Sequence, residues 1–163
     1  SDVVRSCRGW FNFIYYGHDP KLISVLNGGL SKWLKEKKPV TDTTPEINKS
    51  DYKSFERKEL VKDKKAIDQN VENKIFSLID ARSRERFEGK VPEPRKGLRS
   101  GHIKDSFCIP FNDCLNDDKT FKNKDQLKKI FKTISINLEQ KKYCLFMWFW
   151  CYSMCFGTSL FFD

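Results

Sequence analysis

Histidine is scarce in this chain of 163 residues, and its cysteines lack the spacing of a zinc site or of a disulfide framework. The two histidines are His18 and His102. No secretory leader opens the sequence, so we expect reduced thiols and a cytoplasmic or mitochondrial location. The sequence predicts neither a metal nor another cofactor. The six cysteines are Cys7, Cys108, Cys114, Cys144, Cys151 and Cys155.

Acidic residues are in deficit along the whole chain. Lys and Arg number 31 against 22 Asp and Glu, which gives a net charge of +9. The basic residues are spread along the sequence and mixed with acidic ones, as in residues 53–65. This pattern is typical of a solvated surface, so no nucleic-acid partner is expected.

Charge is absent altogether from residues 143–162, which follow Lys141 and Lys142. On hydropathy alone, a stretch of this length with a positive flank is a candidate membrane span. A second explanation of the same stretch comes from its reading frame and is given below.

The middle of the chain alternates strand-like and helix-like segments, which favours an α/β fold with a parallel sheet flanked by helices. Ile75–Ile79 is an apolar run with Asp80 at its carboxyl end, and Cys108–Phe111 is a second, shorter run. Lys124–Ile134 has apolar residues three and four positions apart, as an amphipathic helix requires. Ligands of open α/β sheets bind beyond the carboxyl ends of the strands, so the residues after Asp80 point to a site.

The first part of the chain predicts a smaller set of elements. Arg8–Tyr16 is aromatic and predicts a helix, Leu22–Leu26 has the length of a buried strand, and Ser31–Lys37 predicts an amphipathic helix. Polar residues interrupted by prolines follow and indicate a surface linker. The start at Ser1 inside a structured-looking segment indicates a piece of a longer protein. The sequence thus divides into residues 1–36, a linker at 37–54, and a larger domain at 55–163.

Four motifs lie in order between Asp80 and Ile103, and they are Asp80-Ala81-Arg82, Arg86-Phe87, Pro92-Glu93-Pro94-Arg95 and Gly97-Leu98-Arg99-Ser100-Gly101-His102-Ile103. In order and spacing they resemble the second, catalytic domain of the rhodanese-like sulfurtransferase family, which includes the mercaptopyruvate and thiosulfate sulfurtransferases. Residues 1–36 resemble the end of the first domain of the same family. The resemblance implies an α/β tandem protein with a rhodanese-like domain that is incomplete at both ends.

The resemblance also implies a substrate site. Arg86 and Arg95 match the two substrate-binding arginines of the mercaptopyruvate-type enzymes. A guanidinium suits a carboxylate because its planar fork binds both oxygens at once. His102 is expected to build the loop before the next strand, and Asp80 to cap the loop that follows it, so neither receives a catalytic role.

The cysteine nucleophile of the family is expected at the position of Met147, where a glycine-rich loop is missing. Met and Trp have one codon each, so the nucleotides under Met147–Tyr152 are nearly fixed. Read one nucleotide later, they spell Cys-Gly-Ser-Gly for one choice of the free base, and the codons of Met154 and Cys155 then force a second cysteine. This resembles the family's active-site loop Cys-Gly-Ser-Gly-Val-Thr-Ala-Cys. We infer a one-nucleotide frame disruption near Lys141 and Lys142, which leaves residues 143–163 disrupted.

Two functions are open at this point. By resemblance, the intact protein moves sulfane sulfur from 3-mercaptopyruvate or thiosulfate to a thiol or cyanide acceptor through a cysteine persulfide, with thioredoxin or glutathione as the thiol. The chain as written is expected to be inactive and to fold poorly, because aromatic residues stand where the nucleophile loop belongs. The alternative is a non-catalytic rhodanese-like binding module, held to a membrane by the apolar tail.

Overall fold

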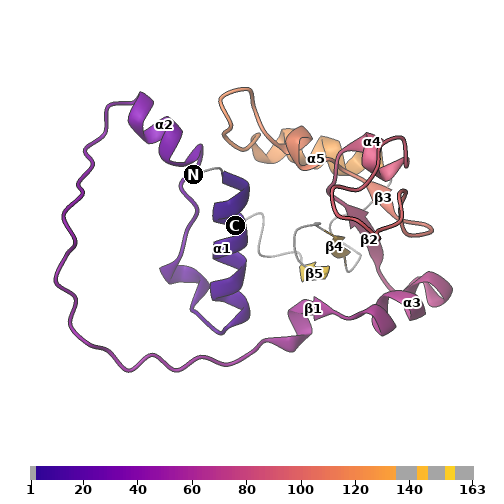
Figure 1. The fold of residues 1–163 in the computed structure, drawn as a ribbon, viewed down its shortest axis with the longest axis horizontal. Coiled ribbons are helices and arrows are strands. Elements are labelled where there is room, and N and C mark those ends of the chain that lie inside the picture. The colour runs from indigo at the N-terminus through magenta and orange to yellow at the C-terminus, as the bar shows by residue number, and fades with distance from the viewer. Residues whose placement is uncertain (1–2, 135–142, 147–152, 157–163) are drawn as a thin grey trace. The chain divides into compact units, whose positions relative to one another are not determined.

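The computed structural model describes residues 3–134, 143–146 and 153–156, which form two compact units (Figure 1). Unit 1 consists of residues 1–57 together with 116–121, and unit 2 contains residues 58–115 and the chain from 122 onward.

Unit 1 is built on the helix α1 (Val3–Tyr15), which buries Val3, Phe11 and Ile14. A short 3-10 turn at Pro20–Leu22 and the helix α2 (Gly29–Lys35) follow. Both helices agree with the sequence-based expectation. The strand expected at Leu22–Leu26 is wrong: no strand forms there, and the side chains of Leu22 and Leu26 are 75% and 49% exposed. An apolar run of this length forms a buried strand only where neighbouring strands satisfy its backbone.

The segment between α2 and unit 2 contains no helix or strand from Val40 to Arg57, and its side chains are mostly exposed. Its beginning is held by a hydrogen bond from Trp33 Nε1 to the carbonyl oxygen of Pro39, at 2.9 Å. Its end packs on the turn after α1, where Gly17 has a φ of +87° and a Cβ would come within 2.5 Å of the Phe55 ring. Only glycine fits this close approach.

Residues 116–121 complete unit 1. The backbone N–H of Phe121 donates to the Asn27 side chain at 2.8 Å, and the Lys32 ammonium lies 3.8 Å from the carboxylate of Asp118. Thr120 donates both its hydroxyl and its N–H to the Asp118 carboxylate. The hydrogen bonds to Thr120 lower the pKa of Asp118.

Unit 2 contains a five-stranded sheet in the order β1-β5-β4-β2-β3. β2 runs parallel to β3 and to β4, whereas β5 is antiparallel to β4 and to β1. Only residues 147–152 separate β4 from β5, too few for the crossover that a parallel pair needs, so β5 turns back. The strands are β1 (Val61–Lys62), β2 (Ser77–Asp80), β3 (Phe107–Cys108), β4 (Tyr143–Phe146) and β5 (Ser153–Phe156).

Helices cover both faces of this sheet, as the alternation of side chains along β2 requires (Figure 1). Ile79 packs with Ile109 under the apolar residues of α5 (Lys124–Thr133). Leu78, the preceding residue of β2, packs with Ile67 of α3 (Lys64–Asn73) on the other side. The predicted α/β fold with helices on either side of the sheet is confirmed, and β2, β3 and β4 form its parallel part.

The ends of the two covering helices follow from local sequence. Asn123 and Gln126 form a reciprocal capping box at the start of α5. Asp63 caps α3 by accepting a hydrogen bond from the N–H of Ala66 at 2.8 Å. The side chain of Asn70, buried near the end of α3, exchanges two hydrogen bonds with the backbone of Phe76 and so ties α3 to the start of β2.

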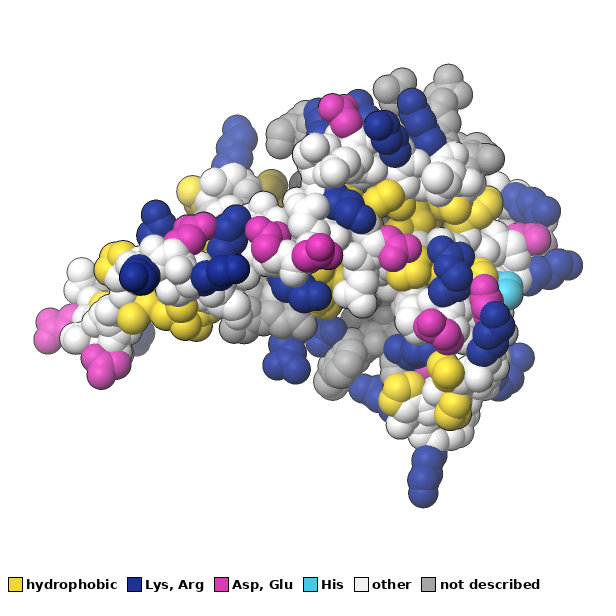
Figure 2. All heavy atoms as spheres, turned by 90° about the horizontal axis from the view of Figure 1, so that it is seen from above, with side chains coloured by type: hydrophobic (Ala, Val, Ile, Leu, Met, Phe, Trp, Pro, Cys, Tyr) yellow, Lys and Arg dark blue, Asp and Glu magenta, His cyan; other side chains and the backbone are white. Residues whose placement is uncertain are grey.

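Charge is dispersed on the face drawn in Figure 2, where Asp and Glu side chains are scattered among those of Lys and Arg. This dispersion agrees with the mixed charges of the sequence. Among the described residues, none of the helices is both long enough and apolar enough to cross a membrane. Within the charge-free tail, residues 143–146 and 153–156 form strands.

Candidate functional site

The candidate site begins where β2 ends. Asp80, the last residue of the strand, is 2% exposed, and its Oδ1 accepts a hydrogen bond from the backbone N–H of Arg82 at 2.9 Å. Asp80 therefore caps the turn after the strand, as expected. The helix α4 (Arg84–Phe87) follows, and then a long loop.

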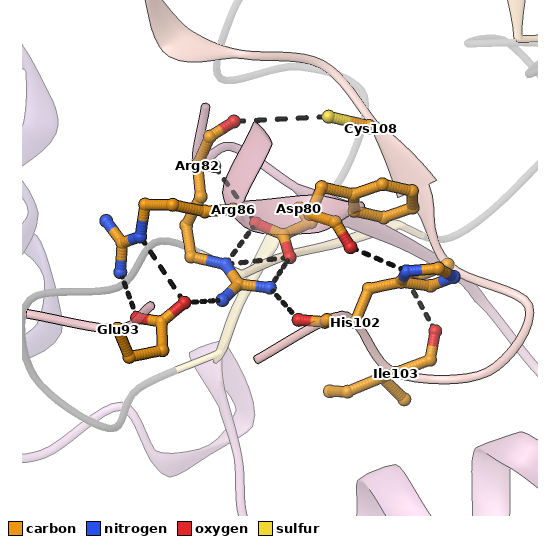
Figure 3. A network of polar contacts seen from close by, with 10 residues as sticks. Asp80, Arg82, Arg86, Glu93, His102, Ile103 and Cys108 are labelled. Atoms are coloured by element: carbon orange, nitrogen blue, oxygen red, sulfur yellow. Dashed lines mark hydrogen bonds and ion pairs between the residues drawn. The ribbon is translucent and has the colours of Figure 1, made fainter. Parts of the chain in front are cut away.

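The guanidinium of Arg82 lies at the centre of the site (Figure 3). Its Nε and Nη2 donate to the Asp80 carboxylate at 2.6 to 3.0 Å. Nη2 also donates to the carbonyl oxygen of Gly101, and Nη1 donates to Glu93 Oε1, both at 2.7 Å. The Arg82 side chain is 6% exposed, so a fully buried cation joins the strand end to two distant points of the loop.

Glu93 joins a second arginine to this cluster. Arg86, on α4, places its Nη2 2.5 Å from Glu93 Oε2, while its Nε lies 3.4 Å from Oε1. The Glu93 side chain is 1% exposed and that of Arg86 is 21% exposed. One buried carboxylate thus lies between two guanidinium groups, in the order Asp80, Arg82, Glu93, Arg86 (Figure 3).

Electrostatics in this cluster favour the charged forms of Glu93 and Arg82. The hydrogen bond from Arg86 is the largest influence on the pKa of Glu93 and lowers it, and Arg82 lowers it further against the opposing effect of burial. Burial by itself would lower the pKa of Arg82, but its bonds to Asp80 and Glu93 outweigh burial and raise that pKa. Two anions and two cations thus balance each other inside the loop.

The two predicted substrate residues differ in their surroundings. Arg86, on α4, is partly buried and lies against Glu93. Arg95, two residues after Glu93, lies in the exposed part of the same loop. The two arginines thus lie in different elements, Arg86 on α4 and Arg95 in the loop that follows, and the Glu93 carboxylate pairs with Arg86.

The two ends of the loop at residues 89–101 lie close to each other. The N–H of Lys90 donates to the carbonyl of Glu85 at 2.9 Å. Gly89 has a φ of +73°, and a Cβ there would lie 3.3 Å from the backbone nitrogen of Gly101. Residues 89–101 therefore form a compact loop whose two ends lie side by side, and glycine permits this approach.

His102 has a structural place, as the sequence analysis expected. Its ring stacks on Phe87 with centroids 3.9 Å apart, and its Nδ1 lies 2.8 Å from the Phe87 carbonyl oxygen. This contact fastens the end of the loop to α4. In the part of the chain that the structure describes, no group of His, Cys, Asp and Glu could hold a metal ion.

Two cysteines of unit 2 lie near the site but are poor nucleophiles. Cys108, in β3, is 8% exposed, and burial raises the pKa of its thiol. Burial, together with the charge of Asp113, raises the pKa of Cys114 to about 11. Neither thiol has the electropositive, partly open environment that stabilises a thiolate.

The expected nucleophile position, Met147, lies outside the described residues, as does Cys151. The strand that leads to it is described: β4 pairs in parallel with β2, and Phe146 stands in register with Asp80. The chain therefore leaves β4 at the same edge of the sheet from which Arg82 and the loop emerge.

Sequence reasoning found the loop but gave no role to Arg82 or Glu93. Both lie inside the motifs named above, in a segment already assigned to the site, and only Arg82 had a further signal, its charge directly after an apolar strand. Their burial could be recognised only from the contacts in three dimensions.

Comparisons with known proteins agree on the family. No family model matches the chain. Rat (Rattus norvegicus) thiosulfate sulfurtransferase is 37% identical over 134 residues, which cover 82% of this chain and 44% of the rat protein. Mouse (Mus musculus) 3-mercaptopyruvate sulfurtransferase is 30% identical over 133 residues, with the same coverage of both chains. The chain thus spans less than half the length of these relatives.

Among solved structures, the 3-mercaptopyruvate sulfurtransferase SseA from Escherichia coli superposes with a TM-score of 0.70 at 22% identity, covering 85% of this chain and 50% of SseA. That likeness defines an α/β protein with the rhodanese fold. With the sequence matches, it shows that the chain belongs to the rhodanese-like sulfurtransferase family.

Proposed function

We propose that the complete protein is a sulfurtransferase that takes sulfane sulfur from a small anionic donor, 3-mercaptopyruvate or thiosulfate. The observation that carries the proposal is the loop after β2, where the Arg86 guanidinium is held at the carboxyl end of a parallel sheet by a buried carboxylate. The relatives named as sulfurtransferases support the same reaction class.

Arg86 and Arg95 bind the donor in this proposal. A planar guanidinium donates two parallel hydrogen bonds to a carboxylate or to the sulfonate oxygens of thiosulfate. The Arg86 side chain pairs with the buried Glu93 carboxylate and is still 21% exposed, so it can reach a ligand from a fixed position. Arg95, in the exposed part of the loop, supplies a second positive charge.

The nucleophile of the proposal is a cysteine at the position of Met147 in the restored reading frame. Its thiolate attacks the sulfur of 3-mercaptopyruvate, the carbon–sulfur bond breaks, and the carbon takes the thiol proton, which leaves a cysteine persulfide and pyruvate. With thiosulfate, the sulfur–sulfur bond breaks and sulfite leaves. A thiol such as reduced thioredoxin or glutathione, or cyanide, then accepts the outer sulfur and restores the thiolate.

The glycine-rich loop of the restored frame fits this chemistry. Glycines let successive N–H groups turn toward one sulfur atom and stabilise its negative charge. Such a loop would follow directly on β4, whose last residue stands opposite Asp80. The thiolate and the Arg86 side chain would then share one edge of the sheet.

The test is to express the complete frame-restored protein and to incubate it with 3-mercaptopyruvate or with thiosulfate. Mass spectrometry should find one added sulfur atom on the cysteine that replaces Met147, and the persulfide should disappear when a thiol acceptor is added. A frame-restored protein that folds but gains no sulfur from either donor would contradict the proposal.

A further inference from the structure

Glu93 is a buried charged side chain. Neither folding nor the proposed reaction by itself explains its burial. It lies in the middle of the loop at residues 89–101, far in sequence from the strand end, yet its side chain is 1% exposed. A buried carboxylate costs several kcal/mol of desolvation unless it is fully paired. The contacts that pair it therefore indicate what the loop is built to hold.

The two arginines that contact Glu93 differ in burial. Arg82 is itself buried and is already paired with Asp80, so its bond to Glu93 fastens the loop to the end of β2. Arg86 is more exposed than Arg82, with 21% of its side chain accessible against 6%. Glu93 thus lies between a more buried arginine, Arg82, and a more exposed one, Arg86 (Figure 3).

The loop holds Glu93 firmly in this place. Besides the bond of Arg82 to the carbonyl of Gly101, the Ser100 hydroxyl lies 3.4 Å from the carbonyl oxygen of Val91, across the loop. The close approach of Gly89 to Gly101 shuts the loop at its base. The Glu93 carboxylate is therefore held in one position. The Arg86 guanidinium must adopt the orientation that pairs with it.

We infer that Glu93 is a positioning residue for anion binding, which fixes the guanidinium of Arg86 at the edge of the sheet. Glu93 is in turn held by Arg82, which is paired with Asp80. This inference rests on the proposed function, since it gives Arg86 the role of donor-binding residue. A free arginine side chain loses rotamer entropy when a ligand orders it, and an arginine already ordered by Glu93 avoids most of that loss.

The experiment uses the complete frame-restored protein with pyruvate as the probe, because pyruvate presents the carboxylate of the donor without its thiol. Binding is followed by NMR through the Nε–Hε signals of the arginine side chains. Four proteins form a double-mutant cycle: the unsubstituted protein, Arg86→Lys, Glu93→Gln, and the double variant. Asn70→Ala is the matched control, since the Asn70 side chain bonds to the backbone of Phe76 and lies in α3, away from the loop.

The expected result is that Arg86→Lys weakens pyruvate binding about tenfold or more and that Glu93→Gln alone weakens it about tenfold. In the double variant, Glu93→Gln should add little to the effect of Arg86→Lys, because the residue it positions has already gone. The Arg86 Nε–Hε signal should exchange with water faster in Glu93→Gln, and Asn70→Ala should leave affinity unchanged.

Three results would overturn the inference in distinguishable ways. If Arg86→Lys has no effect or the unsubstituted protein does not bind pyruvate, the donor-binding role of Arg86 fails and the inference fails with it. If Arg86→Lys weakens binding but Glu93→Gln does not, the proposed function stands and positioning is wrong. If the losses of pyruvate affinity in Arg86→Lys and Glu93→Gln add up in the double variant, Glu93 has only a structural role. Should Glu93→Gln not fold, Glu93→Asp, which keeps the charge but is too short to reach Arg86, takes its place in the same cycle.

Discussion

Asp80 and Phe146 stand opposite each other in the parallel pair of β2 and β4, each as the last residue of its strand. Their carboxyl ends therefore reach the same edge of the sheet, and the chain beyond each of them leads into the region where α/β proteins bind ligands. After Asp80 comes the arginine-rich loop. After Phe146 comes the position where the sequence predicts a displaced nucleophile loop.

The first prediction concerns the nucleotide sequence. Genomic or transcript reads of high coverage should restore an open frame that passes through Cys-Gly-Ser-Gly directly after Phe146. The expectation follows from the codons of Met147–Tyr152, which force the two glycines and the first cysteine of that motif in the shifted frame. Reads that confirm the frame as printed, in a genome without an intact copy, would leave a chain with no nucleophile loop.

The sequence predicted the parts of unit 2 that depend on local pattern. The apolar run before Asp80 became β2, and the spacing of Leu127 and its neighbours became α5, because burial of one face decides both. The same reasoning failed at Leu22–Leu26, where the outcome depends on a partner strand that a local pattern does not reveal. β5 was not foreseen either, since its direction follows from the short connection to β4.

The sequence predicted where the site lies but not the buried contacts inside it. Arg86 and Arg95 were assigned to substrate binding from their motif, an assignment that stays a prediction. Arg82 and Glu93 were passed over because charged residues in a loop are usually exposed, and only the three-dimensional contacts make them buried partners.

A second prediction separates the two substrate arginines in the frame-restored protein. Replacement of Arg86 or Arg95 by lysine should lower kcat/KM for 3-mercaptopyruvate about tenfold to a hundredfold, because lysine cannot make the bidentate contact, worth about 1.5 to 3 kcal/mol. Arg86→Lys should also lower the melting temperature, because Arg86 pairs with a buried carboxylate. Arg95→Lys should not, since Arg95 is exposed.

Arg99→Lys is the control for both variants, because Arg99 is an exposed arginine of the same loop to which no substrate role is given. Steady-state kinetics and thermal unfolding measure the two effects side by side. Unchanged kinetics in Arg86→Lys and in Arg95→Lys would show that neither residue binds the donor.

A third prediction concerns stability. Glu93→Gln should lower the free energy of unfolding by about 3 kcal/mol or more, since it leaves Arg82 buried with one of its two anionic partners removed. Chemical denaturation at pH 7 measures the change. Glu88→Gln is the control, because Glu88 is an exposed residue that pairs with Lys90 at the surface, and such pairs contribute little.

The same variant should also change how stability depends on pH. The pKa of Glu93 is lowered in the folded protein, so its contribution is complete above the ordinary glutamate pKa of about 4.3 and is lost as pH falls through the lowered value. The difference in unfolding free energy between the natural chain and Glu93→Gln should therefore be constant from pH 5 upward and shrink in more acidic solution. A difference that grew on acidification would contradict this assignment.

The last prediction is that the chain as written forms no persulfide, although it contains six cysteines. With a pKa of about 11, only about one Cys114 thiol in ten thousand is ionised at pH 7. Cys108 is buried and has its pKa raised for the same reason. Attack on a sulfane sulfur requires the thiolate, so neither residue can replace the missing nucleophile at a useful rate.

Mass spectrometry after incubation with 3-mercaptopyruvate should find no added sulfur on residues 1–163, while the frame-restored protein gains one sulfur atom. Iodoacetamide provides an independent measure, because it also reacts with thiolates: Cys114 should be alkylated slowly in the folded chain and rapidly after unfolding, when desolvation no longer opposes its ionisation. A persulfide on any cysteine of the chain as written would show that the glycine-rich loop is dispensable, and the requirement for a restored frame would fall with it.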